Sequence, residues 1–209
     1  MTVVKNSEPG RRPRGRPRAF DREEALAKAA ETFWRLGYEG ASVADLTARM
    51  GITPQSLYAA FNSKADLYRE ALAWYQKHIG ASTADALEES DVAVALTRVL
   101  RESAREFTER GRPHGCMVST AVLTCATENQ AVARHVASLR ATTLNLIRAR
   151  ISRGIDEGQL RCGTDVDSLA RFVGAIIQGM SVQAQDGASE RALSALAAHA
   201  VSEIERHRL

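Results

Sequence analysis

Residues 42–64 constrain the fold of this 209-residue chain more than any other stretch. Ser42, followed three residues later by an aspartate, is typical of a capping box, which begins a helix. Gly51 belongs to the residue type that ends a helix in a left-handed turn. Thr53 can cap a second helix whose first position is Pro54, where a missing N–H costs nothing. The stretch therefore predicts two short helices separated by a tight turn.

Such a pair of helices is typical of a helix-turn-helix, and the second helix has the size that enters a DNA major groove. On that helix Leu57 and Phe61 share one face, so we expect them to pack inward. Gln55, Ser56 and Tyr58 fall on the other side and are expected to face outward.

The composition favours an all-α protein, because alanine and leucine are abundant and β-branched runs are short. Apolar periodicity and capping residues predict about nine helices and no internal repeat. The expected ranges are 21–37, 43–50, 54–61, 64–79, 81–89, 92–110, 129–156, 166–185 and 189–207, with a short apolar segment at 116–126. No apolar run approaches the roughly 20 residues that span a bilayer, and the N-terminus has no secretory signal. The expected location is therefore the cytoplasm, with no membrane partner.

Positive charge is concentrated at the N-terminus. The chain carries a net charge of +3, but its first 20 residues hold six basic side chains and one acidic side chain, so the rest is slightly acidic. A basic arm on an acidic body is typical of a protein that contacts nucleic acid. Residues 1–19 are rich in proline and arginine, and we expect them to be a disordered arm.

Within this arm, the sequence Arg-Gly-Arg-Pro-Arg that contains Arg14, Arg16 and Arg18 resembles the AT-hook pattern. Proline keeps such a segment extended, and arginine is attracted to the narrow minor groove of A·T-rich DNA. These three arginines are thus candidate DNA contacts. The alternative is a tail that only raises non-specific affinity for DNA.

Residues 20–72 resemble the DNA-binding domain of the tetracycline-repressor (TetR/AcrR) family of bacterial regulators. The matching residues are Gly37-Tyr38, Ser42-Val43, Met50-Gly51-Ile52-Thr53, Leu57-Tyr58, Phe61 and Ser63-Lys64. The resemblance implies a helix-turn-helix DNA-binding domain at 20–63 and a helical ligand-binding and dimerisation domain at 64–209. It also implies a homodimeric repressor that binds a quasi-palindromic double-stranded DNA operator and is released by a small-molecule effector. No cofactor is implied.

The resemblance and the chemistry of helix ends together indicate the DNA contacts. Ser42 and Lys64 lie at expected helix N-termini, which favour phosphate, and match phosphate-contacting positions of the family. Tyr58 matches a backbone-contacting position, with half-buried packing as the alternative. The residues expected to read base edges are Thr53, Gln55 and Ser56, with Ala59 and Ala60 allowing close approach. A glutamine amide can bridge N6 and N7 of adenine.

The expected helix 166–185 is apolar nearly all round, so it must be buried on all sides. The last helix, 189–207, adds another apolar stripe. We therefore expect self-association, and the resemblance implies a homodimer in which the last two helices form a four-helix bundle. The alternative is an interior helix of a monomer.

The resemblance places the ligand pocket among the middle helices. Candidate lining residues, chosen by position and type, are Trp74, Tyr75, His78, Phe107, Cys116, Met117, Thr120 and Gln178. Ordinary core packing is the alternative for each of them. No set of side chains has metal-ligand spacing, and His114 beside Cys116 comes nearest.

The three cysteines, Cys116, Cys125 and Cys162, form no CxxC pair, so neither a disulfide framework nor a structural zinc site is indicated. Residues 114–118 resemble a Gly-Cys-aliphatic signature that begins a helix in part of the family, where some members sense electrophiles or oxidants. A thiol at a helix N-terminus has its thiolate stabilised, which would suit such a sensor. The alternative is that Cys116 and Cys125 are small buried hydrophobes on an apolar helix.

Two other classes of function remain to be weighed. An enzyme is disfavoured, because the chain has no Gly-x-Ser-x-Gly, no phosphate-binding glycine loop and no His-Glu-x-x-His. An architectural protein that binds A·T-rich DNA through the arm, without a ligand, is the second alternative. Protection of one or a few palindromes would distinguish a repressor from such a protein.

Overall fold

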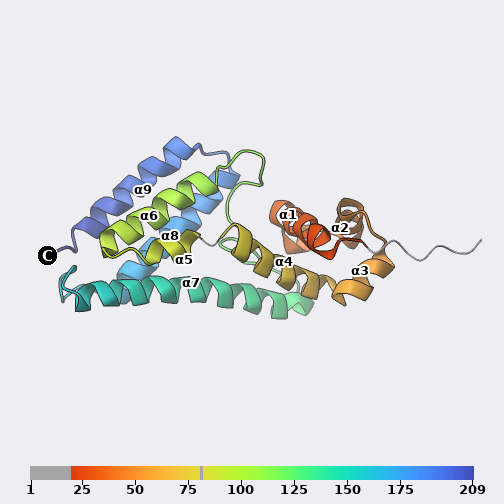
Figure 1. Ribbon diagram of the computed structural model, residues 1–209, viewed down its shortest axis with the longest axis horizontal. Helices are drawn as coiled ribbons and strands as arrows, with labels where there is room; N and C mark the ends of the chain where they lie inside the picture. The colour runs from red at the N-terminus through yellow and green to blue at the C-terminus, as the bar shows by residue number, and fades with distance from the viewer. Residues whose placement is uncertain (1–19, 81) are drawn as a thin grey trace, which may run out of the picture.

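The computed structural model describes residues 20–80 and 82–209, and this part of the chain contains nine α-helices and one short 3-10 helix (Figure 1). The elements are α1 (Arg22–Gly40), α2 (Val43–Met50), α3 (Pro54–Phe61), α4 (Lys64–His78), α5 (Ser82–Leu87), α6 (Val92–Glu106), η1 (Thr127–Asn129), α7 (Gln130–Asp156), α8 (Val166–Gln185) and α9 (Glu190–Glu205). The all-α class is confirmed. The predicted arm, with Arg14, Arg16 and Arg18, lies outside the described residues. Within the described ranges, no helix has the length and apolar character needed to cross a membrane.

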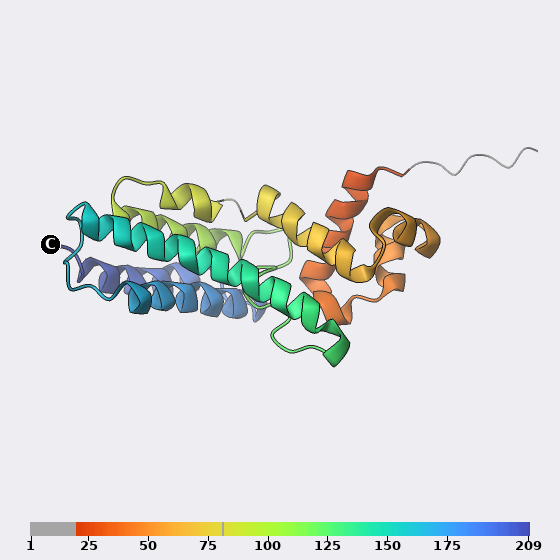
Figure 2. The ribbon, with the colours of Figure 1, turned by 90° about the horizontal axis from the view of Figure 1, so that it is seen from below.

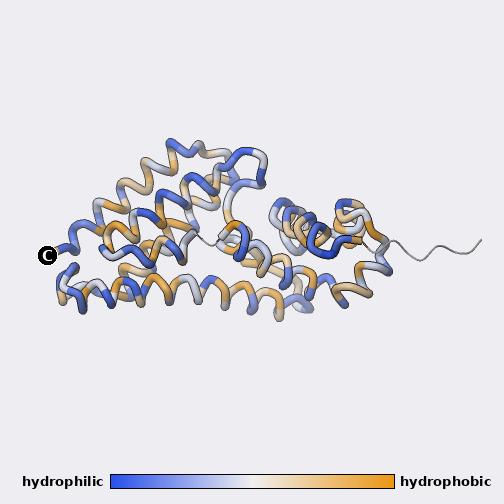
Figure 3. The backbone as a smooth tube through the Cα atoms, in the orientation of Figure 1, coloured by the Kyte–Doolittle hydropathy of each residue, from blue (hydrophilic) through white to orange (hydrophobic). Residues whose placement is uncertain are grey.

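The helices pack around two apolar cores, one at each end of the molecule (Figure 1). Helices α1–α4, which we call the α1–α4 module, enclose a core that contains Phe33, Leu57 and Tyr68. Helices α5, α6, α8 and α9, which we call the α5–α9 module, enclose the other core together with the C-terminal half of α7. Because each helix buries one apolar face, hydrophobic and hydrophilic residues alternate along the chain (Figure 3).

Helix α7 joins the two modules, and Figure 2 shows it running beside the α5–α9 module and reaching the α1–α4 module. Near its start, Val132 and Val136 are buried in the core of the α1–α4 module. Further along, Ile147 and Ile151 are buried in the other core. One continuous helix therefore contributes to both cores and fixes the spacing between them.

Helix α4 belongs to the first core as much as α1–α3 do. Its buried residues Leu67, Tyr68 and Leu72 pack in the same cluster as Phe33 and Phe61. Helix α4 thus completes the core of the α1–α4 module and extends from it toward the α5–α9 module.

The ends of α6 and α1 differ from the expected ones in different ways. Helix α6 ends at Glu106, four residues before the expected end, where the N–H groups of Thr108 and Glu109 donate to carbonyls three residues back instead of four. The Thr108 hydroxyl donates to the Ala104 carbonyl at 2.8 Å. Helix α1 is interrupted at Gly37, as expected, but resumes helical hydrogen bonding as far as Gly40.

Residues 116–126, the expected short apolar segment, form turns rather than the helix that the Gly-Cys-aliphatic signature implies. Two of their carbonyl groups, those of Val118 and Ala121, accept hydrogen bonds from the Arg140 guanidinium at 3.1 and 2.8 Å. Val122 has a φ of 49°, which a helix does not tolerate. An arginine on α7 thus holds this stretch in a non-helical path. We call residues 107–129 the α6–α7 segment.

Helix α8 is not covered on all sides within one chain. Its residues Leu169, Val173 and Met180 are buried in the core of the α5–α9 module. By contrast, Phe172 and Ile176 are only half-buried. One apolar face of α8 therefore has no cover within a single chain, as the expectation of self-association requires.

Candidate nucleic-acid interface and effector cavity

The α2–α3 turn is held by local hydrogen bonds that the sequence predicts. Ser42 and Asp45 form the complete capping box at the start of α2. Gly51 ends α2 in the left-handed conformation, with a φ of 71°, which allows a side chain only at a cost in strain. The Thr53 hydroxyl caps α3 by accepting from the Ser56 N–H at 3.1 Å. These bonds set the angle at which α3 leaves the turn.

Helix α3 presents one face to the core and one to solvent, as expected. Leu57 and Phe61 are almost fully buried. Gln55 is exposed and the Tyr58 side chain is 47% exposed, whereas Ser56 is half-buried. The outward face is therefore free to approach a flat or grooved partner.

Within the part of the chain that the structure describes, the remaining candidate DNA contacts already have protein partners. Ser42 is exposed, but its hydroxyl and its N–H both contact the Asp45 side chain. The Lys64 ammonium lies 4.5 Å from the centre of the Tyr38 ring, and partial burial lowers the pKa of Lys64. The Thr53 and Ser56 hydroxyls contact each other at 2.9 Å. Ser42 and Thr53 would have to share these bonds with DNA.

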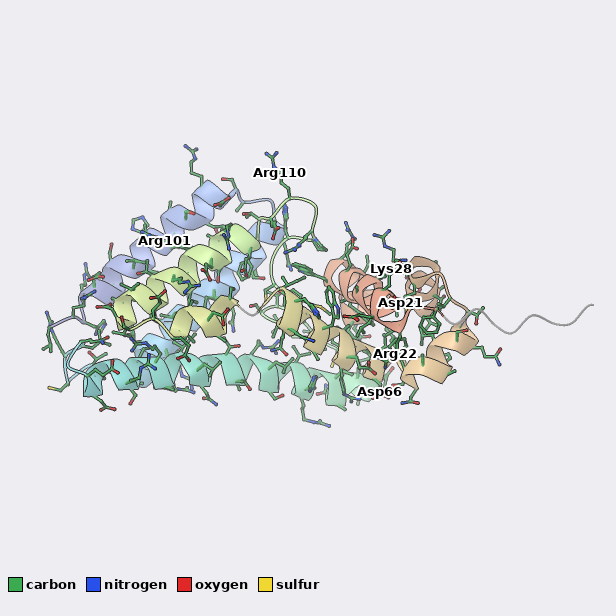
Figure 4. All side chains as sticks on the ribbon, in the orientation of Figure 1. Asp21, Arg22, Lys28, Asp66, Arg101 and Arg110 are labelled. Carbon is green, nitrogen blue, oxygen red and sulfur yellow. The ribbon has the colours of Figure 1, made fainter. Side chains whose placement is uncertain are left out.

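Arg22 is a basic residue beside α3 that the sequence reasoning missed. Its guanidinium lies 4.5 Å from the centre of the Phe61 ring and is paired with Glu70 at 2.7 Å. Figure 4 shows Arg22 at the start of α1 and Asp66 near the start of α4. The available signal was its position, directly after the basic arm.

A cavity of about 330 Å³ lies between α4, α6, α7, α8 and the α6–α7 segment. It is lined by four of the eight predicted ligand residues: Tyr75, Phe107, Cys116 and Gln178. Burial, together with the neighbouring Cys116 thiol, raises the pKa of the Tyr75 phenol well above its ordinary value. Tyr75 also packs in the core of the α1–α4 module, so one side chain belongs to both the cavity wall and that core.

The other four predicted ligand residues lie elsewhere. Trp74 and His78 stack on each other along α4, with ring centres 4.6 Å apart, and line other surface hollows. Met117 and Thr120 line a separate hollow of about 630 Å³ between α1 and the α6–α7 segment. Met117 is 3% exposed and packs in the core of the α1–α4 module.

Two charged residues of the cavity wall were missed by the sequence reasoning, Glu106 and Arg140. Burial raises the pKa of the Glu106 carboxyl and lowers the pKa of the Arg140 guanidinium. They lie on different helices, 34 positions apart, so no local motif could have joined them.

Cys116 does not lie at a helix N-terminus, so the expected stabilisation of its thiolate by a helix dipole is wrong. Its N–H donates to the Ser181 hydroxyl at 2.8 Å, and its sulfur accepts from the Val118 N–H at 3.4 Å. The side chain is half-buried and packs against both cores. In residues 20–80 and 82–209, no group of three or more His, Cys, Asp or Glu could hold a metal ion.

A cluster of hydrogen bonds ties the end of α1 to the start of α7. The Glu39 carboxylate accepts from the Asn129 amide at 2.9 Å and from the Ala126 N–H at 3.1 Å. These bonds lower the pKa of Glu39. The Tyr38 hydroxyl also contacts Asn129, at 3.4 Å. The α6–α7 segment is therefore attached to the α1–α4 module at one end and lines the cavity at the other.

This arrangement agrees with the comparisons with known proteins. A family model described as bacterial regulatory proteins of the tetR family matches residues 25–71, and one described as a tetracyclin repressor-like C-terminal domain matches residues 93–200. The chain belongs to the TetR family. It is a helix-turn-helix transcriptional repressor of a family that is not enzymatic, and the resemblance found in the sequence is confirmed.

Relatives of this TetR-family chain match it over most of its length. The transcriptional repressor ComR of Escherichia coli K12 is 34% identical over 189 residues, which are 90% of each protein. The repressor BdcR of the same organism is 35% identical over 187 residues, which are 89% of this chain and 90% of BdcR. A solved structure of a cysteine variant of the TetR-family regulator CifR, complexed with a 26-bp double-strand operator DNA, is 42% identical. It covers 90% of this chain and 98% of its own, with a TM-score of 0.86.

Proposed function

We propose that this protein is a ligand-responsive repressor that binds a quasi-palindromic operator as a homodimer and is released by a small-molecule effector. The observation that carries the proposal is that α3 presents an open face at one end of the molecule while a cavity lies in its middle, with α4 extending from one to the other. The complex of CifR with operator DNA supports the choice of partner. A bacterial operator as the partner places the protein in the cytoplasm.

In this proposal, residues 1–19 are a DNA-contacting arm, residues 20–63 bind DNA, and residues 64–209 bind the effector and dimerise. Gln55, with Thr53 and Ser56, reads base edges from α3. Tyr58, Ser42 and Lys64 contact the phosphate backbone and set the register of the helix on the duplex.

The uncovered face of α8 supports the homodimer. Between α8 and α9 lies a surface groove of about 640 Å³, whose walls include Phe172, Ile176 and Leu196. All three side chains are only partly buried within one chain. Burying such apolar surface against a second copy is favourable at about 25 cal/mol per Å². A symmetric pair would also hold the two α3 helices at a fixed spacing.

The effector acts through its difference in affinity for two arrangements of the dimer. A ligand that binds the cavity better when the two α3 helices are out of register draws the protein away from DNA, by no more than that difference. Tyr75 connects the cavity with the α1–α4 module, because its side chain lines the cavity and also packs in the core of that module. A bound ligand can therefore act on the module through Tyr75.

Selection of duplexes from a random library, followed by footprinting, tests this function. The proposal expects one short two-fold symmetric sequence to be enriched and protected. Diffuse protection of A·T-rich DNA would support the architectural alternative instead. Sedimentation of the protein with the selected duplex checks that two chains bind; a single 22.7 kDa chain, free and on DNA, would contradict the homodimer.

A thiol-based sensor within the same family is the second candidate, and the position of Cys116 favours it. The Cys116 side chain lines the cavity, and its sulfur interacts with the Tyr75 hydroxyl. It also packs against both cores, so an adduct on this sulfur would disturb both modules. Addition of N-ethylmaleimide, in which the sulfur bonds to the alkene carbon and a proton goes to the neighbouring carbon, is a suitable probe.

The sensor candidate expects N-ethylmaleimide to release wild-type protein from its selected duplex and Cys116→Ser to stay bound. Cys162→Ser is the matched control, because Cys162 is exposed and does not line the cavity. Equal release of wild type and Cys116→Ser would exclude this candidate.

A further inference from the structure

Of the three charged side chains of the 330 Å³ cavity, Arg140 from α7 and Glu106 from the end of α6 have no ion-pair partner among the described residues. The third charged residue of the wall, Arg171, is bonded to Asp167 at 2.7 Å. The cavity thus holds one unpaired cation and one unpaired carboxyl on separate helices.

The guanidinium of Arg140 is only half used by the protein. Its Nη1 donates to the carbonyls of Val118 and Ala121 in the α6–α7 segment. Its Nε and Nη2 have no hydrogen-bond acceptor within residues 20–80 and 82–209, and neither is sealed from solvent as a buried orphan. The edge of the guanidinium formed by Nε and Nη2 is therefore open, and two parallel N–H groups of this kind match the two oxygens of a carboxylate.

Keeping the Arg140 guanidinium partly desolvated and without a counter-ion costs free energy. Burial lowers the pKa of Arg140, which means that its charged form is less stable there than in water. An anion bound at the open edge would offset that cost, whereas a neutral ligand would leave it in place.

We propose that the effector is a small organic monoanion, a carboxylate with an apolar body, whose carboxylate binds the open edge of Arg140. This inference rests on the proposed function, because it names the class of effector for the same cavity. Phe107, Leu144 and Ile147 on the wall provide the apolar contact. The volume of about 330 Å³ is at the lower end for ligand pockets, which selects a small molecule.

Glu106 sets a limit on the charge of the ligand. Its carboxyl lines the same cavity, so in its ionised form it would repel a second negative charge on the ligand. A neutral hydrogen-bond donor on the ligand could instead donate to the Glu106 carboxyl. The pair of unpaired groups therefore favours a monoanion over a dianion.

Arg140 also joins the ligand to the DNA-binding part of the protein. The carbonyl groups that it holds, those of Val118 and Ala121, follow Met117, which is buried in the core of the α1–α4 module. A carboxylate on the free edge of the guanidinium would share that group with the α6–α7 segment. Occupancy of the cavity thus acts directly on the segment that is attached to α1.

Calorimetric titration of the DNA-free, full-length protein tests the inference. The probes are hexanoate, benzoate and phenylacetate, each with its uncharged amide, and hexylamine as a cation of similar size. At least one carboxylate should bind, at least about tenfold more tightly than its amide. Arg140→Gln should weaken that carboxylate about tenfold or more, and Arg140→Lys should weaken it less, because it keeps the charge. Arg171→Gln is the matched control and should change the affinity less than about twofold, since Arg171 is already paired.

Arg140 also braces the α6–α7 segment, so thermal unfolding of each variant separates loss of folding from loss of binding. If Arg140→Gln is unfolded, the carboxylate affinities of Arg140→Lys and Arg171→Gln are compared instead. The inference then requires the larger loss of affinity in Arg140→Lys. Binding of no carboxylate, equal binding of an acid and its amide, preference for hexylamine, or equal effects at Arg140 and Arg171 would each overturn the inference.

The same probes, added to protein on its selected duplex, separate this inference from the proposed function. A carboxylate that binds through Arg140 without releasing DNA supports the anion site and contradicts the ligand-responsive repressor. Release by an amide, with no carboxylate bound, supports the repressor and overturns the anion site.

Discussion

Gly115 is the point at which the α6–α7 segment is pressed against α8, and replacing it should be costly for two separate reasons. Its φ is +77°, a conformation that L side chains rarely adopt. A Cβ at this position would also lie 2.7 Å from the Ser181 carbonyl oxygen and 2.9 Å from Gln185 Cγ. The Ser181 carbonyl is part of the α8 backbone, so it cannot move aside as a flexible side chain would.

The magnitude of the effect follows from these two terms. The left-handed backbone costs an alanine about 1–2 kcal/mol. Overpacking against a rigid helix adds about 1–3 kcal/mol, so Gly115→Ala should lower the free energy of unfolding by about 2–5 kcal/mol. Gly111 is the matched control, because its φ is +86° but a Cβ there meets nothing within 4 Å. Gly111→Ala should cost only the backbone term, about 1–2 kcal/mol.

Urea denaturation of both variants, followed by circular dichroism, measures the difference between them. Gly115→Ala should be less stable than Gly111→Ala by at least about 1 kcal/mol. Equal losses in the two variants would show that the segment is not packed against α8 as described. The Cys116 N–H donates to the Ser181 hydroxyl of α8, so equal losses would also contradict the position of Cys116 against α8.

Three further predictions concern DNA, pH and the dimer. Gln55→Ala should relax base preference by about 1–3 kcal/mol in binding assays, and equal losses on selected and random duplexes would refute its role. Asn129 donates to Glu39 and lowers the pKa of its carboxyl below the ordinary 4.5, so the stability difference between wild type and Glu39→Gln should be full above pH 4.5. It should shrink as the pH falls through the lowered pKa; a pH-independent difference in urea unfolding would contradict the assignment. Ile176→Asp should shift sedimentation toward monomer, whereas Val94→Asp, an exposed position on α6, should not. A dimer unaffected by Ile176→Asp would exclude the α8 interface.

The parts of the fold that the sequence predicts are those held by local interactions. Ser42 and Thr53 each bond to a backbone group three residues away, so the ends of α2 and α3 can be read from a few neighbouring letters. The outward face of α3 follows from helical periodicity in the same way. These features lie within one continuous stretch, and they shape the surface that we propose binds DNA.

The α6–α7 segment could not be predicted, because its conformation depends on distant partners. Its carbonyls are held by Arg140, about 20 residues further along, and its start is packed on Ser181 of α8. An apolar pattern alone favours a helix there. The cavity is hard to predict for the same reason, because Glu106 and Arg140 line one cavity only after their separate helices have packed together.

Footprinting of the full-length protein on its selected duplex shows whether two copies of α3 read DNA as a symmetric pair. We expect two protected half-sites related by two-fold symmetry, with their centres about one helical turn or slightly more apart. Protection of one isolated half-site, or protection spread without symmetry over the duplex, would contradict it.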